Sequence, residues 1–275
     1  MTPTKPLLSL PANTHGRDFV VGDIHGAFQL VLEAMHAVRF DPTVDRLFSV
    51  GDMIDRGPHS PRVLQFLAQP CVYAVRGNHE DELLSLYSSG APDEDVLRFA
   101  CQFNGMQWWL DVPHGLRQQI LQAISRLPLV IEVKTPRGNA GLLHADIPHG
   151  MSWGVFKRAI LINDERTRHT CLWGRTRIER RDQTGVPGIG RVFVGHTPNW
   201  NGVQRFGNVI AIDSAAVQGL QSTPAAGHLS MVNLIMKTES LTAPRRTPEL
   251  LIEIKDYDLA PDSPYGASGL LAPAI

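Results

Sequence analysis

Cysteine is scarce in this sequence, which contains three such residues among 275. Cys71, Cys101 and Cys171 are odd in number, lie far apart and form no CxxC pair. This usage excludes a disulfide framework and a thiolate zinc site. We therefore expect the three side chains to behave as small buried apolar groups.

Long hydrophobic runs are absent as well. No apolar run approaches the roughly 18–20 residues that a membrane span requires. The apolar stretch near the N-terminus is too short for a signal peptide. These observations predict a cytoplasmic protein with no membrane partner.

A surplus of charge of one sign is also lacking, because 26 Lys and Arg residues stand against 27 Asp and Glu residues. The net charge of −1 argues against a general nucleic-acid binder, whose phosphate contacts need a basic surplus. We interpret residues 1–275 as a single domain, with a core over about 18–255 and an extended or flexible tail at 256–275. The composition leaves the oligomeric state open.

The first third of the chain alternates short apolar runs with segments of helical periodicity. Strands are expected at 19–21, 47–50 and 72–75, and helices at 27–38, from Ser60 and from about Glu80. Ser60 and Pro61 would supply an N-cap and a first-turn proline for the second of these helices. Such an alternation is typical of a parallel α/β sheet covered by helices.

The rest of the chain predicts a helical insertion followed by a second set of strands. Residues of about 90–126 contain no strong β run and are expected to form a helical cap. The later strands are expected at 129–133, 141–143, 192–194, 209–212, 229–235 and 250–254. The basic stretch 175–190 predicts a mobile loop. The fold class that follows is α/β, a two-layer β-sandwich flanked by helices with a helical cap insertion.

Each of five predicted strands leads into potential metal ligands. In chain order these are Asp23 and His25, Asp52, Asn78 and His79, His144, and His196. The carboxyl ends of neighbouring strands converge on one edge of a sheet, where α/β proteins place their sites. A single Asp or His at a strand end is usually a capping or core group, but five such placements favour a site.

The donor set contains carboxylates, imidazoles and an amide, without thiolate. It suits Mn²⁺, Fe or Zn²⁺ better than Ca²⁺ or Cu(I). More ligands are present than one ion uses, which favours a dinuclear site bridged by a carboxylate, with ions about 3.5–4 Å apart. Such ions polarise a phosphoryl group and lower the pKa of a bound water, so that hydroxide is available near neutral pH. The predicted reaction is phosphoester hydrolysis by direct attack of this hydroxide.

The strand-end motifs carry a resemblance to a known family. They read GDIHG at 22–26, GDMIDRG at 51–57, GNHE at 77–80, a lone His144 and GHTP at 195–198. Together they resemble the motifs of calcineurin-like metallophosphoesterases. More narrowly, they are similar to those of the small bacterial and phage-type serine/threonine protein phosphatases of the PPP family. The resemblance spans about residues 18–215 and implies the metallophosphoesterase fold.

The resemblance also implies a role for each ligand. Asp23 and His25 would hold the first metal ion, and Asp52 would bridge the two ions. The second ion would be held by Asn78, His144 and His196. Mn²⁺ is the metal that we expect at both positions, with Fe or Zn²⁺ as alternatives.

Catalytic and phosphate-binding residues follow from the same resemblance. The family's acid corresponds to His79, oriented by Asp55. An imidazolium beside a carboxylate can donate its proton to the leaving alkoxide as the bond to phosphorus breaks. Arginines of the family bind phosphate oxygens by bidentate contacts. They correspond to Arg56, Arg76 and Arg175, with Arg177 as the alternative to Arg175.

Several other residues have weaker signals. The segment 104–106 with Trp108 and Trp109 resembles a block that the family uses near its site, although such aromatics are more often core. Asp213 would either orient His196 or cap a turn. Surface or capping roles are expected for His59, His114 and His149.

Two enzymatic functions are compatible with the motifs. The first is a phosphoprotein phosphatase acting on phosphoserine and phosphothreonine, with phosphotyrosine or a small phosphoester as further substrates. The alternative is a symmetrical dinucleoside polyphosphate hydrolase, acting on diadenosine tetraphosphate. That sister family typically has a small residue in place of Asp55 and an Asp in place of Glu80, which favours the phosphatase. An inactive phosphoprotein-binding regulator is disfavoured because every expected ligand is present.

Overall fold

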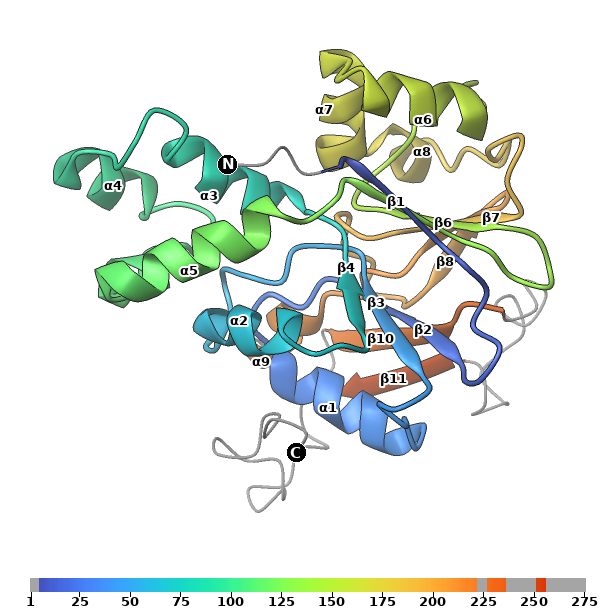
Figure 1. Ribbon diagram of the computed structural model, residues 1–275, viewed down its shortest axis with the longest axis horizontal. Helices are drawn as coiled ribbons and strands as arrows, with labels where there is room; N and C mark the ends of the chain where they lie inside the picture. Colours follow the sequence, from blue (N-terminus) through green and yellow to red (C-terminus); the bar gives the residue numbers. More distant parts are fainter. Residues whose placement is uncertain (1–4, 222–226, 236–250, 256–275) are drawn as a thin grey trace.

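Two β-sheets pack face to face in the computed structural model, with helices on both outer surfaces (Figure 1). The structure describes residues 5–221, 227–235 and 251–255. This arrangement confirms the predicted α/β fold class. The expected tail at 256–275 lies outside the described residues. Among the helices of the described part, none is long and apolar enough to cross a bilayer.

The first sheet has five strands and contains the three strands predicted in the first third of the chain. In spatial order the strands are β11 (Leu251–Lys255), β10 (His228–Asn233), β2 (Asp18–Val21), β3 (Arg46–Ser49) and β4 (Val72–Ala74). Strands β2, β3 and β4 are parallel, and β10 and β11 are added in antiparallel fashion. The carboxyl ends of β2, β3 and β4 therefore lie on the same edge.

Helices α1 (Phe28–Ala37) and α2 (Val63–Leu67) connect these strands and lie on the outer side of the sheet (Figure 1). On α1, Leu30, Val31 and Ala34 are buried, as the helical spacing predicted. The predicted N-cap at Ser60 is wrong by one residue. His59 is the N-cap, and Ser60 begins the short 3₁₀ helix η1 (Ser60–Arg62), where its hydroxyl donates to the carbonyl of Gly57.

The second sheet has six strands. In spatial order they are β1 (Leu7–Leu10), β5 (Val130–Val133), β6 (Ala140–Leu143), β7 (Arg191–Val194), β9 (Val209–Ala211) and β8 (Gln204–Phe206). Strands β6, β7 and β9 are parallel to one another. The edge strands β1 and β8 were not predicted, because they are short and neither shows an alternating pattern of buried and exposed residues.

Helices α6 (Trp153–Leu161), α7 (Glu165–Trp173) and α8 (Thr176–Glu179) lie above the six-stranded sheet in Figure 1. Helix α8 falls within the stretch 175–190, which was predicted as a mobile loop. The prediction is wrong for these residues, because Arg177 is buried and its Nε lies 2.9 Å from Oδ1 of Asp146. A buried ion pair of this kind anchors the start of the stretch on the fold.

Residues of about 90–126 are mainly helical, as predicted. They contain α4 (Glu94–Ala100), η2 (Gln107–Asp111) and α5 (His114–Ser125), and they follow α3 (Asn78–Leu86). In Figure 1 these helices project to one side of the two sheets, and α5 packs against α2 and α3. A last short helix, α9 (Ala216–Gln221), follows β9.

Apolar side chains fill three layers of core. The layer between the sheets contains Val20, Phe48, Ile131 and Phe193, all fully buried. The two other layers lie between each sheet and its helices. All three cysteines are buried and free, which confirms that they form no disulfide with one another. The packed sandwich gives the strand-end loops a rigid base.

Candidate metal centre

The predicted ligands converge at one end of the sandwich, where the loops after β2 and β3 meet those after β6 and β7. All six are buried, and none is more than 5% exposed. They are Asp23, His25, Asp52, Asn78, His144 and His196. Residues that are separated by up to 173 positions therefore share one small volume, as the strand-end pattern predicted.

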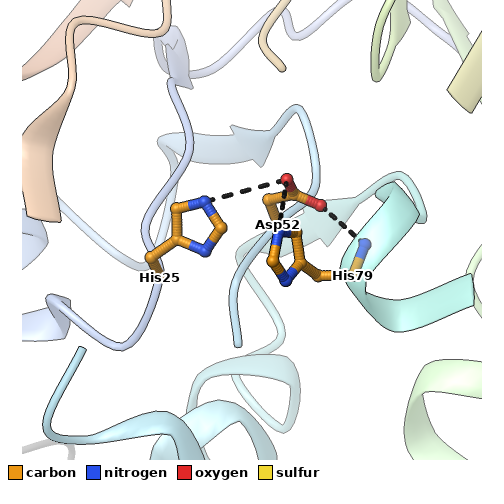
Figure 2. Close-up of side chains that lie close together, drawn as sticks. All are labelled: His25, Asp52 and His79. Atoms are coloured by element: carbon orange, nitrogen blue, oxygen red, sulfur yellow. Dashed lines mark hydrogen bonds and ion pairs between the residues drawn. The ribbon is translucent and has the colours of Figure 1, made fainter. Parts of the chain in front are cut away.

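Asp52 lies at the centre of the cluster. Figure 2 shows His25 beside its carboxylate and the ring of His79 below it. Its Oδ2 lies 3.8 Å from Nε2 of His25, 3.9 Å from Nε2 of His79 and 3.3 Å from Nε2 of His144. Two groups of potential ligands share this carboxylate, one with His25 and His79 and one with His144 and His196. A carboxylate common to both groups is placed as a bridging ligand would be.

Asn78 joins the second group through its side-chain oxygen. This oxygen lies 2.8 Å from Nε2 of His144 and 2.9 Å from Nδ1 of His196. Asp23 belongs to neither group in the structure, and its carboxylate accepts the backbone N–H of His196 at 3.0 Å. The contact nevertheless brings Asp23 beside the other predicted ligands.

Backbone carbonyls orient two of the imidazoles. Nδ1 of His25 donates to the carbonyl of Ile54, and Nδ1 of His144 donates to the carbonyl of Val50, both at 2.8 Å. Because Nδ1 is engaged, Nε2 of each ring faces Asp52. A hydrogen bond to the ring nitrogen remote from the metal is the usual device that orients a ligating histidine.

The electrostatics of the cluster suit a cation. Burial, with Asp213 and Asp52 nearby, raises the pKa of Asp23 well above its ordinary value. Burial lowers the pKa of His25 to about 3, and burial with His144 and Arg175 nearby lowers the pKa of His196 to about 2. These imidazoles are therefore neutral near pH 7, the state in which histidine binds a metal.

One protein cation already contacts this cluster. The guanidinium of Arg56 donates to Nε2 of His25 at 2.8 Å and to Nε2 of His79 at 2.9 Å. Meanwhile Nε2 of His196 is buried with no hydrogen-bond partner within the described residues. Imidazole nitrogens, an amide oxygen and carboxylates that face one another form a donor set that fits divalent ions of the Mn²⁺, Fe or Zn²⁺ type.

The loops take unusual backbone conformations to present these side chains. His25, Asp52 and His196 have positive φ angles of 46°, 48° and 68°. Such angles are uncommon outside glycine, and they cluster at functional sites. A Cβ at Gly77 would lie 2.2 Å from Oδ1 of Asp52, so only glycine permits this approach.

Glu80 holds two of the loops together. Its carboxylate accepts backbone N–H groups from Asp52 at 3.0 Å, Met53 at 2.8 Å and Gly77 at 2.8 Å, and a longer contact of 3.3 Å comes from Ile54. The side chain is fully buried. In the sequence, Glu80 is recognisable only as part of the GNHE motif. Its structural role could have been suspected from its place in the capping box of α3.

His79 and Asp55 form the predicted pair. Nδ1 of His79 lies 2.7 Å from Oδ2 of Asp55, and both side chains are buried. Burial alone would lower the pKa of His79, but the carboxylates of Asp52 and Asp55 raise it above its ordinary value. The indole of Trp108 donates to Oδ1 of Asp55 at 2.6 Å. Trp108 therefore fixes the carboxylate, a role in addition to the core packing expected of it.

Two of the predicted arginines border the cluster. Arg56 lies between His25 and His79, and the carbonyl of Gly105 accepts its backbone N–H at 2.9 Å. Nη1 of Arg175 contacts the carbonyl of His196 at 3.3 Å. Both guanidinium groups are therefore within the surroundings of the cluster.

Arg76 and Arg177 are engaged elsewhere. Nη1 of Arg76 lies 3.2 Å from Oδ1 of Asp81, and Nη2 donates to the carbonyl of Ser125 at 2.9 Å. Arg177, the alternative to Arg175, is paired with Asp146. The structure brings neither guanidinium into contact with the predicted ligands, and phosphate binding by Arg76 stays a prediction that these contacts do not support.

The residues with weaker sequence signals have structural contacts or positions of their own. Asp213 accepts the backbone N–H of Ala215 at 2.9 Å, which is the turn-capping alternative. His59 stands at the N-cap position of η1 without a side-chain capping hydrogen bond, the exposed His114 begins α5, and the exposed His149 pairs with Asp182. These positions agree with the surface or capping roles expected.

A buried cluster of carboxylates, imidazoles and an amide on a two-sheet sandwich defines a hydrolase of the metallophosphoesterase class. A sequence model of the calcineurin-like phosphoesterases matches residues 19–210, and the chain belongs to this family. The matched region contains all the predicted ligands.

Within this family, the chain is similar to proteins with more specific names. The chain is 34% identical to serine/threonine-protein phosphatase 1 of Salmonella typhimurium, over 82% of this chain and 98% of that protein. It is 29% identical to serine/threonine-protein phosphatase 2 of Escherichia coli, over 84% of this chain and 99% of that protein. It is also 33% identical to a symmetrical bis(5'-nucleosyl)-tetraphosphatase of Coxiella burnetii, but over 58% of this chain and 49% of that protein.

Solved structures share the fold. A protein serine/threonine phosphatase from Saccharomyces cerevisiae superposes with a TM-score of 0.55 at 20% identity, over 92% of this chain and 84% of that chain. At this identity the likeness concerns the fold alone.

Proposed function

We propose that this enzyme is a metal-dependent phosphoprotein phosphatase, which hydrolyses phosphoserine and phosphothreonine monoesters with two Mn²⁺ ions. The observation that carries the proposal is the buried pair of His79 and Asp55 beside the ligand cluster. Similarity to two bacterial serine/threonine phosphatases over nearly their whole length supports it.

The ligand assignment in this proposal follows the cluster. Asp23 and His25 would hold one ion, Asp52 would bridge, and the second ion would be held by Asn78, His144 and His196. Divalent ions bound there supply electrostatic stabilisation of the phosphoryl oxygens and a nucleophilic water of lowered pKa.

The protein's own groups then perform two tasks in the proposed reaction. Arg56 binds the phosphate oxygens, and it exchanges its contacts with His25 and His79 for the substrate. Once Nε2 of His79 is released and protonated, it donates a proton to the leaving serine or threonine oxygen. Asp55 and Trp108 hold the ring so that Nε2 faces the reacting group. Arg175 is the second proposed phosphate ligand.

The alternative is hydrolysis of symmetrical dinucleoside polyphosphates, and the relative from Coxiella burnetii is the observation in its favour. That similarity covers about half of the relative, whereas the phosphatase similarities cover nearly all of each relative. The longer coverage favours the phosphatase.

A substrate panel tests the proposal. Purified protein would be supplied with Mn²⁺, Fe²⁺, Ni²⁺ or Mg²⁺ and assayed on a phosphothreonine peptide, diadenosine tetraphosphate and p-nitrophenyl phosphate. We expect phosphopeptide turnover with Mn²⁺ at a kcat/KM well above that for the dinucleotide. Fast dinucleotide cleavage without phosphopeptide turnover would reject the phosphatase assignment. Hydrolysis of p-nitrophenyl phosphate is the control that shows that the purified protein is active.

A further inference from the structure

A pocket of about 330 Å³ lies between α3, the segment joining α4 to η2, and the end of α7. Its walls include Glu82 from α3, Phe103, Asn104 and Met106 from the joining segment, and Trp173 from α7. Its position relative to the metal centre indicates what it can bind.

Contacts and chain positions of the lining residues place the pocket beside the candidate metal centre. The ring of Trp173 packs edge-on against His196, with centroids 5.9 Å apart. Glu82 lies on α3, one turn after His79. Asn104 precedes Gly105, whose carbonyl accepts the backbone N–H of Arg56. A substrate whose phosphate lies on the cluster therefore has this pocket close by.

The pocket has a negative and partly apolar lining. The carboxylate of Glu82 accepts the amide of Asn104 at 3.0 Å, and within the described residues it forms no ion pair with Lys or Arg. Asp81 differs, because Arg76 and Arg168 pair with it at 3.2 and 2.6 Å. No Lys or Arg is among the described residues that line the pocket.

Apolar surface completes the lining. Phe103 is 53% exposed, which is unusual for a large aromatic side chain, and it lies on the same wall as Met106. An exposed aromatic next to a concave surface is typical of a binding surface. The alkyl stem of a Lys or Arg side chain could pack on such a wall while its charged head reaches a carboxylate.

We propose that this pocket binds the polypeptide that flanks the phosphorylated residue, and that Glu82 selects a Lys or Arg side chain there. The inference rests on the proposed phosphatase function. A dinucleoside polyphosphate fits the pocket poorly. Its additional phosphates would approach the Glu82 carboxylate without a lysine or arginine in the lining to neutralise them.

Two matched phosphothreonine peptides test the selection. They differ only in Lys or Glu at the positions flanking the phosphothreonine. For the unmodified enzyme we expect kcat/KM to favour the Lys peptide by about fivefold, mainly through KM, as an ion pair of partly exposed charges would give. In Glu82→Gln, which keeps an oxygen for Asn104, the ratio should fall to about one. In Glu82→Lys the preference should reverse.

Glu33→Gln is the matched control, because Glu33 lies on α1 and its change is also isosteric. It should leave the ratio of the two peptides as in the unmodified enzyme. A Glu82→Gln enzyme with the full Lys preference would overturn the proposal, as would equal turnover of both peptides by the unmodified enzyme. These results leave the phosphatase function intact. Cleavage of diadenosine tetraphosphate with no turnover of either peptide would instead reject that function, and the inference with it.

Discussion

The two sheets contribute to the metal centre in different ways. The five-stranded sheet supplies three consecutive loops that are hydrogen-bonded to one another. The carbonyl of Asp52 accepts the backbone N–H groups of Ile24 at 3.0 Å and His25 at 2.8 Å, and Glu80 binds the same loop from the other side. The six-stranded sheet supplies His144 and His196, which complete the cluster. Its loops add ligands but no part of the acid pair.

The residues proposed to carry out the chemistry are concentrated on the loops of the five-stranded sheet. The proposed bridging carboxylate and the proposed acid pair all follow β3 and β4, within residues 52–79. His144 and His196 depend on these loops for orientation, because Val50 binds the ring of His144 and Asp23 binds the backbone of His196. Changes in the first sheet's loops should therefore affect both metals and the reaction, whereas changes in the second should affect metal binding.

The largest effect on activity and metal content is expected from loss of the Asp52 carboxylate. Asp52→Asn should lower kcat by at least about 10³-fold and reduce the content of both ions, because the carboxylate lies in both ligand groups. Metal analysis of the purified variant, with activity on p-nitrophenyl phosphate, measures both effects. Two ions retained per chain would contradict a bridging role.

A change of His79 distinguishes an effect on the reaction from an effect on metal binding within the five-stranded sheet. His79→Asn should lower kcat by about 10²–10⁴-fold, the usual contribution of a general acid, while the metal content stays unchanged. Potential ligand atoms of His79, His25 and Asp52 lie within 4.8 Å of one another, so His79 could itself bind a metal. The metal content of the variant therefore decides whether His79 is the acid or a ligand. His196→Asn is the comparison from the second sheet and should lose metal. If His79→Asn also loses an ion, His79 is a ligand and not the acid.

The carboxylates predict a pH dependence of stability without metal. Burial raises the pKa of Glu80 to about 7 and that of Asp213 to about 6, and it raises that of Asp23 as well. A group with a raised pKa in the folded state stabilises the fold below its unfolded pKa, and this stability is lost as the pH rises through the folded pKa. In chelator-treated protein, these three carboxylates by themselves should lower the free energy of unfolding by a few kcal/mol, roughly, between pH 4.5 and 7.5. The lowered pKa values of His25 and His196 raise it over the same range, so the effect of the carboxylates is measured in a His25→Asn/His196→Asn variant, in which these imidazoles do not titrate.

Denaturant unfolding at several pH values would measure this effect. Added Mn²⁺ should stabilise the protein more at pH 7.5 than at pH 5, because the ions neutralise the ionised carboxylates. A metal-free stability of the His25→Asn/His196→Asn variant that rises over this range would show that the hydrogen bonds to these carboxylates outweigh their burial.

The smallest effect is expected from a change of Glu80, which tests whether this side chain links the loops of the five-stranded sheet. Glu80→Gln should destabilise the protein by about 1–3 kcal/mol, because an amide has one acceptor oxygen for the buried N–H groups that the carboxylate accepts. Denaturant unfolding would be compared with Glu33→Gln, an isosteric change on α1. An equal effect of both changes would mean that Glu80 does not hold the loops together.

Much of the fold followed from local patterns. Buried runs such as 19–21 and 47–50 and the amphipathic spacing of α1 are local signals, and the structure confirms them. The edge strands β1 and β8 could not be found in this way, because their pairing with β5 and β9 decides their conformation. The helical turn at Thr176–Glu179 likewise depends on the distant Asp146.

The sequence alone indicated the donor chemistry of the candidate site. Five strand ends carry carboxylate, amide and imidazole donors, and parallel strands bring such ends to one edge within each sheet. The packing of the two sheets brings the two edges together, and tertiary contacts fix which arginines reach the cluster, since Arg76 is paired with Asp81 and Arg177 with Asp146. Tertiary contacts also place Trp108 on Asp55. Spacing along a chain reports which residues leave a strand together, whereas side-chain partners depend on contacts between segments far apart in sequence.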